Sequence, residues 1–150
     1  MKILITGGCG FVGSNIAVYL KKRLKMSKIY SLDSLMRKGS TLNKKRLSLK
    51  GIRNFKIDIT NYSKISRLQK FDLVIDCCAE PAIEASKKDP DRVFKTNLLG
   101  TFNILKKCIK DKSNLIFLSS SRVYSIKKLR EIINKNKLIK KIKIKKLINE

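Results

Sequence analysis

A cluster of glycines near the amino terminus is the part of this sequence whose spacing most clearly implies chemistry. Residues 8–13 read GCGFVG, a GxGxxG motif, and Gly7, Gly10 and Gly13 also satisfy GxxGxxG. Glycine triplets occur in plain turns too, but this one follows a β-branched run and opens a run with helical spacing. Such glycines form a tight turn and let a pyrophosphate approach the N–H groups at a helix start. We therefore expect a dinucleotide to bind here.

An acidic residue, Asp33, follows Gly13 by twenty positions and closes the second short strand expected, at residues 28–32. A carboxylate at that place accepts hydrogen bonds from the adenosine ribose hydroxyls and repels the 2′-phosphate of NADP, which favours NAD as the cofactor. Two alternatives stay open. Arg37 and Lys38 lie close behind and could bind that phosphate, and Asp33 could simply cap a loop.

Short apolar strands alternate with helical runs along most of the chain. This alternation predicts an α/β fold, a Rossmann-type doubly wound parallel sheet of about five strands with helices on both faces. The segment 37–49 is ambiguous between a loop and a loop followed by a helix. We expect strands at 2–6, 28–32, 54–57, 72–78 and 114–118, and helices at 11–25, from Asn61 or Ser63 to 68, and at 90–110.

Polar residues follow the expected strands at their carboxyl ends. Ligands of open parallel sheets bind at that edge, so these residues are expected to share one site. They are residues 7–13, Asp33, Asp58, the pair Ala79–Glu80, and residues 119–121.

The charge balance is strongly basic, with 36 Lys and Arg against 11 Asp and Glu and a formal net charge of +25. Such a balance raises nucleic acid or an anionic membrane as partners. The excess is almost all Lys, while Arg, which suits bidentate recognition, is scarce, so we favour compositional drift. The alternative is a basic module that contacts nucleic acid or anionic lipid through residues 126–150.

Two further features exclude other classes of protein. No apolar stretch approaches the ~20 residues of a membrane span, and we expect a cytoplasmic protein without specific nucleic-acid or membrane partners. The four cysteines form no CxxC pair and the chain has no histidine, which argues against a zinc site and against Ser-His or Cys-His nucleophiles. The adjacent Cys77 and Cys78 are interpreted as small buried hydrophobic residues.

Several segments carry a specific family resemblance. TGGCGFVGSN (Thr6 to Asn15) is similar to the first turn of the extended short-chain dehydrogenase/reductase superfamily, which contains the NAD-dependent nucleotide-sugar epimerases and dehydratases. The RKG that follows Asp33, together with SRVYS, most resembles the CDP-paratose 2-epimerase (CDP-tyvelose epimerase) branch. The resemblance continues to about residue 125 through LDSLMRKGS (Leu32 to Ser40), KIDIT (Lys56 to Thr60), CAEPAIEAS (Cys78 to Ser86), TNLLGTFNIL (Thr96 to Leu105) and LSSSRVYS (Leu118 to Ser125).

The resemblance implies an NAD site, a nucleotide sugar as substrate in a full-length relative, and a homodimer as the family's assembly. In the parent reaction NAD would oxidise C2 of a CDP-linked deoxysugar, and the keto intermediate would rotate and be reduced on its other face. Carried over position by position, the resemblance implies that the pyrophosphate is bound by Gly7, Gly10, Phe11, Val12 and Gly13, and the adenosine ribose by Asp33 and Arg37. Asp58 and Ile59 would lie beside the adenine, and Ala79 and Asn97 would line the cofactor. Ser120 would contact the reacting sugar oxygen.

One departure from the family concerns its catalytic base, the Tyr of a YxxxK pair located well after the catalytic Ser/Thr. Tyr124 and Lys128 have this spacing, but Tyr124 lies only four residues past Ser120 and corresponds to the tyrosine of the family's VYS turn. We therefore expect the base to be missing, together with the later strands and the sugar-nucleotide domain. The sheet would then be incomplete at its carboxyl-terminal edge.

These expectations define two regions. Residues 1–125 would form the NAD-binding domain, and residues 126–150, rich in Lys and Ile, a helical or poorly ordered extension. The chain would be a fragment of a longer epimerase, which we favour, or a short protein that keeps NAD binding and has lost catalysis. A third possibility is that a second chain supplies the base. We expect NAD binding with little or no turnover.

Overall fold

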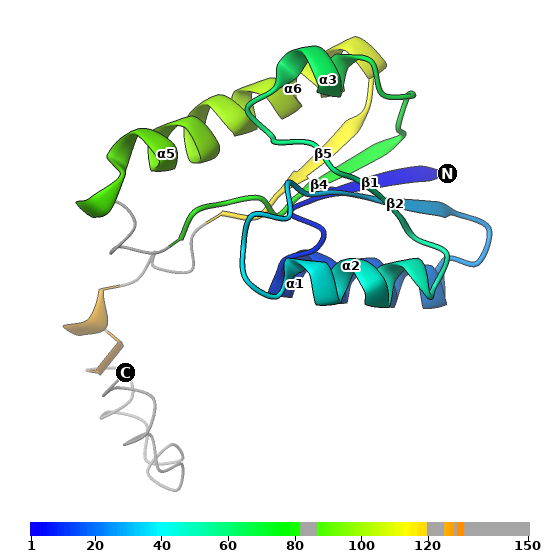
Figure 1. Ribbon diagram of the computed structural model, residues 1–150, viewed down its shortest axis with the longest axis horizontal. Helices are drawn as coiled ribbons and strands as arrows, with labels where there is room; N and C mark the ends of the chain where they lie inside the picture. Colours follow the sequence, from blue (N-terminus) through cyan, green and yellow to red (C-terminus); the bar gives the residue numbers. More distant parts are fainter. Residues whose placement is uncertain (82–86, 120–124, 128, 131–150) are drawn as a thin grey trace, which may run out of the picture. The chain divides into compact units, whose positions relative to one another are not determined.

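The computed structural model describes residues 1–81, 87–119, 125–127 and 129–130, and two units, Met1–Leu118 and Ser119–Glu150, are treated separately. The first unit is a five-stranded, all-parallel sheet with the order β3-β2-β1-β4-β5, which confirms the predicted fold class. Helices α1 and α2 cover one face, and α3 and α6 cover the other, while α5 extends beyond the sheet on the side of α6 (Figure 1). The strands are β1 (Lys2–Thr6), β2 (Lys28–Leu32), β3 (Arg53–Phe55), β4 (Leu73–Asp76) and β5 (Asn114–Phe117); the helices are α1 (Phe11–Arg23), α2 (Ser40–Ser48), α3 (Tyr62–Ser66), α5 (Pro90–Phe94) and α6 (Thr101–Asp111), and the π-helical segment η1 (Lys95–Gly100) joins the last two.

The core lies in two layers because successive side chains of a strand point to opposite faces. Ile3 and Ile5 of β1 belong to the cluster that includes Ala17 and Leu47 from α1 and α2. Leu4, between them, belongs to the cluster on the α3 and α6 side. The central strands are therefore apolar on both faces, as in other parallel sheets covered by helices.

Several expected boundaries differ from the structure. The strand expected at 72–78 is shorter, the helices expected at 11–25 and up to 68 end two residues earlier, and the strand expected at 114–118 ends one residue earlier. Two further differences have a structural cause. The strand expected at 54–57 ends at Phe55, because Ile57 N donates to Phe55 O over 2.9 Å and turns the chain out of the sheet. The helix expected at 90–110 is divided into α5, η1 and α6, and the wider hydrogen-bonded loops of η1 insert a π turn between two α-helices. The ambiguous segment 37–49 contains α2, which begins at Ser40.

A buried ion pair fixes α6 to the chain that leads into β4. Lys107 Nζ lies 2.8 Å from Asp111 Oδ2 and donates to the carbonyl oxygens of Leu68 and Gln69 over 2.8 and 3.2 Å. Asp111 Oδ2 also accepts from Phe71 N over 3.2 Å. The two charged side chains are 1% and 2% exposed. Three backbone partners and the contact between the two side chains thus satisfy a pair of charges that would otherwise be costly to bury.

Candidate functional site

The turn between β1 and α1 leaves no room for a side chain at Gly7, Gly8 or Gly13. Gly7 has a φ of +57°, and a Cβ added there would lie 2.8 Å from Cys77 O and 2.9 Å from the Cα of Cys78. A Cβ on Gly13 would overlap the carbonyl oxygen of Gly7, so this glycine lets the first turn of α1 press against the loop. Helix α1 is thereby held close to the carboxyl end of β1.

The start of α1 presents free backbone donors. Gly10 caps the helix without a side-chain hydrogen bond, and the first intrahelical bond runs from Ser14 N to Gly10 O over 3.1 Å. The N–H groups of Phe11, Val12 and Gly13 precede that bond and have no partner within the helix. Three donors and the positive end of the helix dipole suit a phosphate group.

Asp33 lies directly beside this turn, as expected. Its Oδ2 accepts from Cys9 N over 3.0 Å, and its Oδ1 accepts from Leu35 N over 2.8 Å. Each carboxylate oxygen keeps a further lone pair for a hydroxyl donor, so the half-buried side chain can still bind a ribose. The contact with Cys9 joins the end of β2 to the glycine turn.

Asp58 and Ile59 shape the loop after β3. Asp58 Oδ1 accepts from Thr60 N over 2.8 Å and from Thr60 Oγ1 over 2.7 Å, while Ile59 is buried. The buried side chain of Asn103 on α6 donates to the carbonyl oxygens of Ile59 and Thr60, both over 3.0 Å. Asn103 was not among the sequence candidates, although it lies in the same quoted segment as Asn97.

The loop after β4 is held by an amide and two arginines. Asn97 of η1 accepts from Glu80 N over 2.7 Å and donates to Glu80 O over 3.1 Å, which fixes the backbone next to Ala79. The buried Glu80 carboxylate pairs with Arg37 through Oε1 and with Arg92 of α5 through Oε2, the latter at 3.3 Å. Asn97 and Arg37, both expected to contact a cofactor, thus bind protein groups in this structure.

A second buried carboxyl lies beneath the site and was missed by the sequence analysis. Asp76, at the end of β4, accepts hydrogen bonds at Oδ1 from Thr6 Oγ1 and, over 3.2 Å, from Cys78 N. Its Oδ2 is buried without a hydrogen-bond partner in the described structure. Burial raises the pKa of this carboxyl above its ordinary value, and the bonds from Thr6 and Cys78 oppose the rise. No local signal in the sequence separates Asp76 from a strand-end turn residue.

Comparison with known proteins agrees with this geometry. Residues 3–141 match the model of the NAD-dependent epimerase/dehydratase family. The chain belongs to this family. A CDP-paratose 2-epimerase from Salmonella typhi is 37% identical over 133 residues, which cover 83% of this chain and 38% of that protein. A dTDP-D-glucose 4,6-dehydratase from Dictyostelium discoideum is 36% identical over 128 residues, covering 82% of this chain and 30% of that protein.

Solved structures of family members show the same fold. A UDP-glucuronic acid 4-epimerase variant from Bacillus cereus, in complex with a fluorinated sugar nucleotide and NAD, superimposes with a TM-score of 0.74 at 30% identity and covers 83% of this chain and 42% of that one. A UDP-glucose 4-epimerase from Thermus thermophilus in complex with NAD gives a TM-score of 0.68 at 26% identity, covering 85% and 43%. The chain thus spans less than half the length of these family members.

The remaining sequence candidates do not add a catalytic group to the described site. Ser120, expected to contact the sugar, and Tyr124 and Lys128 lie outside the described residues. Cys77 and Cys78 are only half-buried, whereas Cys9 and Cys108 are buried. Burial raises the pKa of all four thiols, to about 12 for Cys78 and about 11 for the others, so they are protonated at neutral pH.

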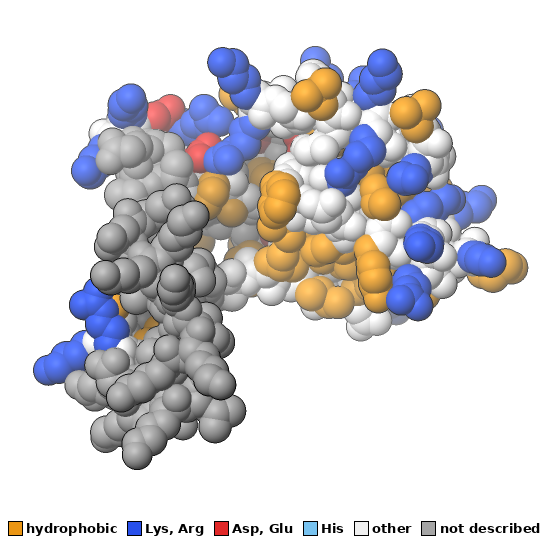
Figure 2. All heavy atoms as spheres, turned by 90° about the horizontal axis from the view of Figure 1, so that it is seen from below, with side chains coloured by type: hydrophobic (Ala, Val, Ile, Leu, Met, Phe, Trp, Pro, Cys, Tyr) orange, Lys and Arg blue, Asp and Glu red, His pale blue; other side chains and the backbone are white. Residues whose placement is uncertain are grey.

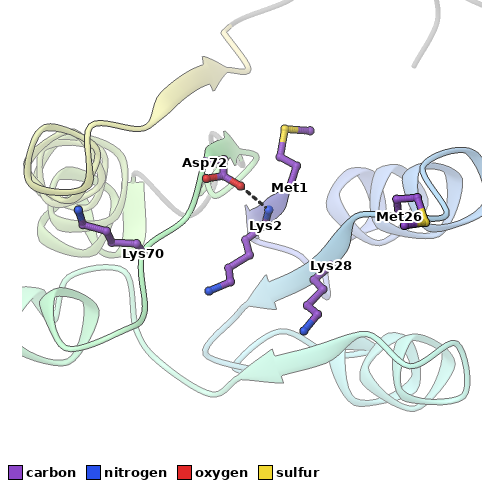
Figure 3. Close-up of a pocket in the computed structure, with 6 residues that line it drawn as sticks. All are labelled: Met1, Lys2, Met26, Lys28, Lys70 and Asp72. Atoms are coloured by element: carbon purple, nitrogen blue, oxygen red, sulfur yellow. Dashed lines mark hydrogen bonds between the residues drawn. The ribbon is translucent and has the colours of Figure 1, made fainter.

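A shallow hollow of about 290 Å³ lies at the opposite edge of the sheet, where the strands begin. Lys2, Lys28 and Lys70 line it, and Asp72 accepts from Lys2 N over 2.7 Å (Figure 3). Ligands of parallel sheets bind at the carboxyl ends of the strands, so this hollow is separate from the family's cofactor edge.

Surface charge is dispersed over the face seen from below. Lys and Arg side chains are spread around it, with hydrophobic side chains between them (Figure 2). On the described residues, no helix is both long and apolar enough to span a membrane, and no group of three or more His, Cys, Asp or Glu residues could hold a metal ion.

Proposed function

We propose that this chain binds NAD at the carboxyl edge of its sheet, as the cofactor-binding portion of a nucleotide-sugar epimerase or dehydratase. The observation that carries the proposal is the turn of Gly7 to Gly13, which brings three unpartnered N–H groups beside a carboxylate suited to a ribose. These donors would hold the pyrophosphate, and Asp33 would hold the adenosine ribose. Structures of family members solved with NAD support this assignment.

The rest of the site divides into residues that touch the cofactor and residues that position its loops. Ile59 and Ala79 would lie against the cofactor, and Asp58 would hold the loop beside the adenine through its bonds to Thr60. Asn97 would act indirectly, through the Glu80 backbone that it clamps from both sides.

We further propose that the parent reaction is CDP-paratose 2-epimerisation, on the likeness to the Salmonella enzyme. The cofactor would supply hydride transfer at C2 of the sugar, and Ser120 would hydrogen-bond the reacting oxygen. Among the tyrosines only Tyr124 is followed by Lys at the fourth position, and it lies only four residues past Ser120. We therefore expect little or no turnover from the 150-residue chain, with residues 1–125 binding NAD and residues 126–150 forming an extension.

An exposed apolar stripe supports a homodimer. Phe102, Leu105 and Ile109 on α6 are all exposed, and their i, i+3, i+7 spacing places them on one side of the helix. A second copy would cover this stripe, and size-exclusion chromatography with light scattering reports the mass.

The four free thiols fit a reducing compartment, and we place the protein in the cytoplasm.

The test is a fluorescence titration of the purified chain with NADH and NADPH, at low and moderate salt. We expect saturable binding that prefers NADH, and we expect Asp33→Ala to lose most of that preference. Asp72→Ala removes the same charge at the opposite edge of the sheet and serves as the matched control. Absence of NADH binding in the folded chain would refute the proposal, and binding that moderate salt abolishes would favour nonspecific attraction to the basic surface.

A further inference from the structure

The Glu80 carboxylate joins two arginines from different parts of the fold. Arg37 comes from the loop after β2, and Arg92 comes from α5. The Glu80 side chain is 8% exposed, while the arginines are 49% and 44% exposed. Because β1 lies between β2 and β4 in the sheet, the pair between Arg37 and Glu80 links the loops that follow the two strands flanking β1.

Arg37 stands where it could recognise a different cofactor. It follows Asp33 by four residues, and Asp33 is the group placed for the adenosine ribose. An arginine near that ribose is the usual partner of the 2′-phosphate of NADP, because its guanidinium matches a phosphate in charge and shape. In this structure the Arg37 guanidinium instead donates to Glu80.

We propose that Glu80 determines cofactor specificity: by pairing with Arg37 it withholds that guanidinium from a 2′-phosphate, so that the site takes NAD in preference to NADP. This inference rests on the proposed function. Moving Arg37 to a phosphate would break a charge-assisted contact and leave the buried Glu80 with Arg92 as its one basic partner among the described residues. Asp33 acts directly by repelling the phosphate, whereas Glu80 acts through Arg37.

The local charge balance explains the direction of the effect. Asp33 and Glu80 contribute two negative charges, and Arg37 and Arg92 contribute two positive ones. The group is therefore neutral before a dinucleotide binds. Glu80→Gln changes the charge of the group to +1 and removes the carboxylate that holds Arg37, so that Arg37 can bind a phosphate. The substitution keeps the size of the side chain and leaves the hydrogen bonds between Asn97 and the Glu80 backbone in place.

The experiment measures dissociation constants for NADH and NADPH at one ionic strength. In Glu80→Gln we expect NADPH to bind about tenfold more tightly than in the unmodified chain, with NADH changed less than about twofold. Adding Arg37→Gln to this variant should return the ratio of the two constants to its original value. Asp91→Asn removes an exposed carboxylate beside Arg92 on α5 and controls for the general rise in positive charge.

Each other outcome overturns the inference. An unchanged ratio in Glu80→Gln, a change that persists without Arg37, or an equal change in Asp91→Asn would each show that the pair does not select the cofactor. Should Glu80→Gln alone fail to fold by circular dichroism, the double variant with Arg37→Gln decides, because it removes the pair without changing the net charge of the group. It keeps the original ratio of the two constants if the pair withholds Arg37, and it weakens NADPH binding several-fold if Arg37 already reaches the phosphate. A folded chain that binds no NADH refutes the proposed function, whereas NADH binding with an unaltered ratio refutes only the role of Glu80.

Discussion

Replacing Lys107 by Met removes the positive member of the buried pair on α6 while keeping most of the side-chain volume. Asp111 would remain as an unpaired carboxylate at 2% exposure, and the carbonyl oxygens of Leu68 and Gln69 would each lose a donor. Breaking a buried pair from one side costs about 3–5 kcal/mol. Since a domain of this size is stable by about 5–15 kcal/mol, we expect loss of a large part of the free energy of unfolding.

Urea unfolding followed by far-ultraviolet circular dichroism measures this loss. For a urea slope of about 2 kcal/mol/M, the midpoint should fall by about 1.5–2.5 M. Lys110→Met is the matched control, because Lys110 lies on the same helix and donates to Ser66 O over 3.1 Å but is exposed. That variant should lose less than about 1 kcal/mol.

A second substitution separates the unpaired charge from the loss of packing. Asp111→Asn, added to Lys107→Met, removes the uncompensated carboxylate, and its amide oxygen can still accept from Phe71 N. Part of the lost stability should therefore return. The reasoning is refuted if Lys107→Met costs no more than Lys110→Met, or if the added Asp111→Asn lowers the midpoint further.

Three other substitutions address the site itself. Asp76→Asn keeps the acceptor for Thr6 and Cys78 but removes a buried carboxylate. Because the pKa of Asp76 is raised in the folded chain, ionisation of this group destabilises the wild-type protein as the pH rises above the ordinary pKa of 3.8. Urea midpoints should therefore show the variant more stable by about 1–2 kcal/mol at pH 7 and little different near pH 4. A gain that is larger at pH 4 would contradict this account. Gly13→Ala would force a Cβ against the Gly7 carbonyl oxygen, and NADH affinity should fall at least about tenfold in titrations where circular dichroism still shows a folded chain. Asn97→Ala leaves two Glu80 backbone groups without their partner, so NADH titration should show weaker binding even though the side chain itself is placed against protein; an unchanged affinity would argue against an indirect role.

The sequence predicted those features that depend on local spacing. The fold class and the position of Asp33 at the same sheet edge as the glycine turn follow from alternating strands, a glycine motif and one acidic residue. The sequence offers Asn61 and Ser63 as the amino-terminal cap of α3, and the structure assigns the cap to Asn61, whose Oδ1 accepts from Lys64 N over 3.0 Å. Local hydrogen bonds of this kind involve residues only a few positions apart, so pattern rules can detect them.

Features that depend on distant residues were not predictable in the same way. Arg37 and Glu80 are 43 positions apart, and only the order of the strands brings their loops together. Lys107 and Asp111 have the i, i+4 spacing of an ordinary surface pair, and nothing local shows that the helix buries them. The early end of β3 depends on a turn at Phe55, and no Gly or Pro at this turn indicates it in the sequence.

The π-helical segment η1 has a consequence for insertions and deletions in this region. Asn97 lies within the segment and clamps the loop after β4, while Asn103 lies beyond it and holds the loop after β3. A π turn accommodates one extra residue and keeps the flanking helices in phase, whereas a residue added to or removed from the regular first turn of α6 would rotate everything before it by about 100° relative to the rest of that helix. Arg92 and Asn97 would then point away from Glu80, although every side chain they need would still be present. The number of residues between Asn97 and Asn103 therefore constrains this site as strictly as their chemical identity does.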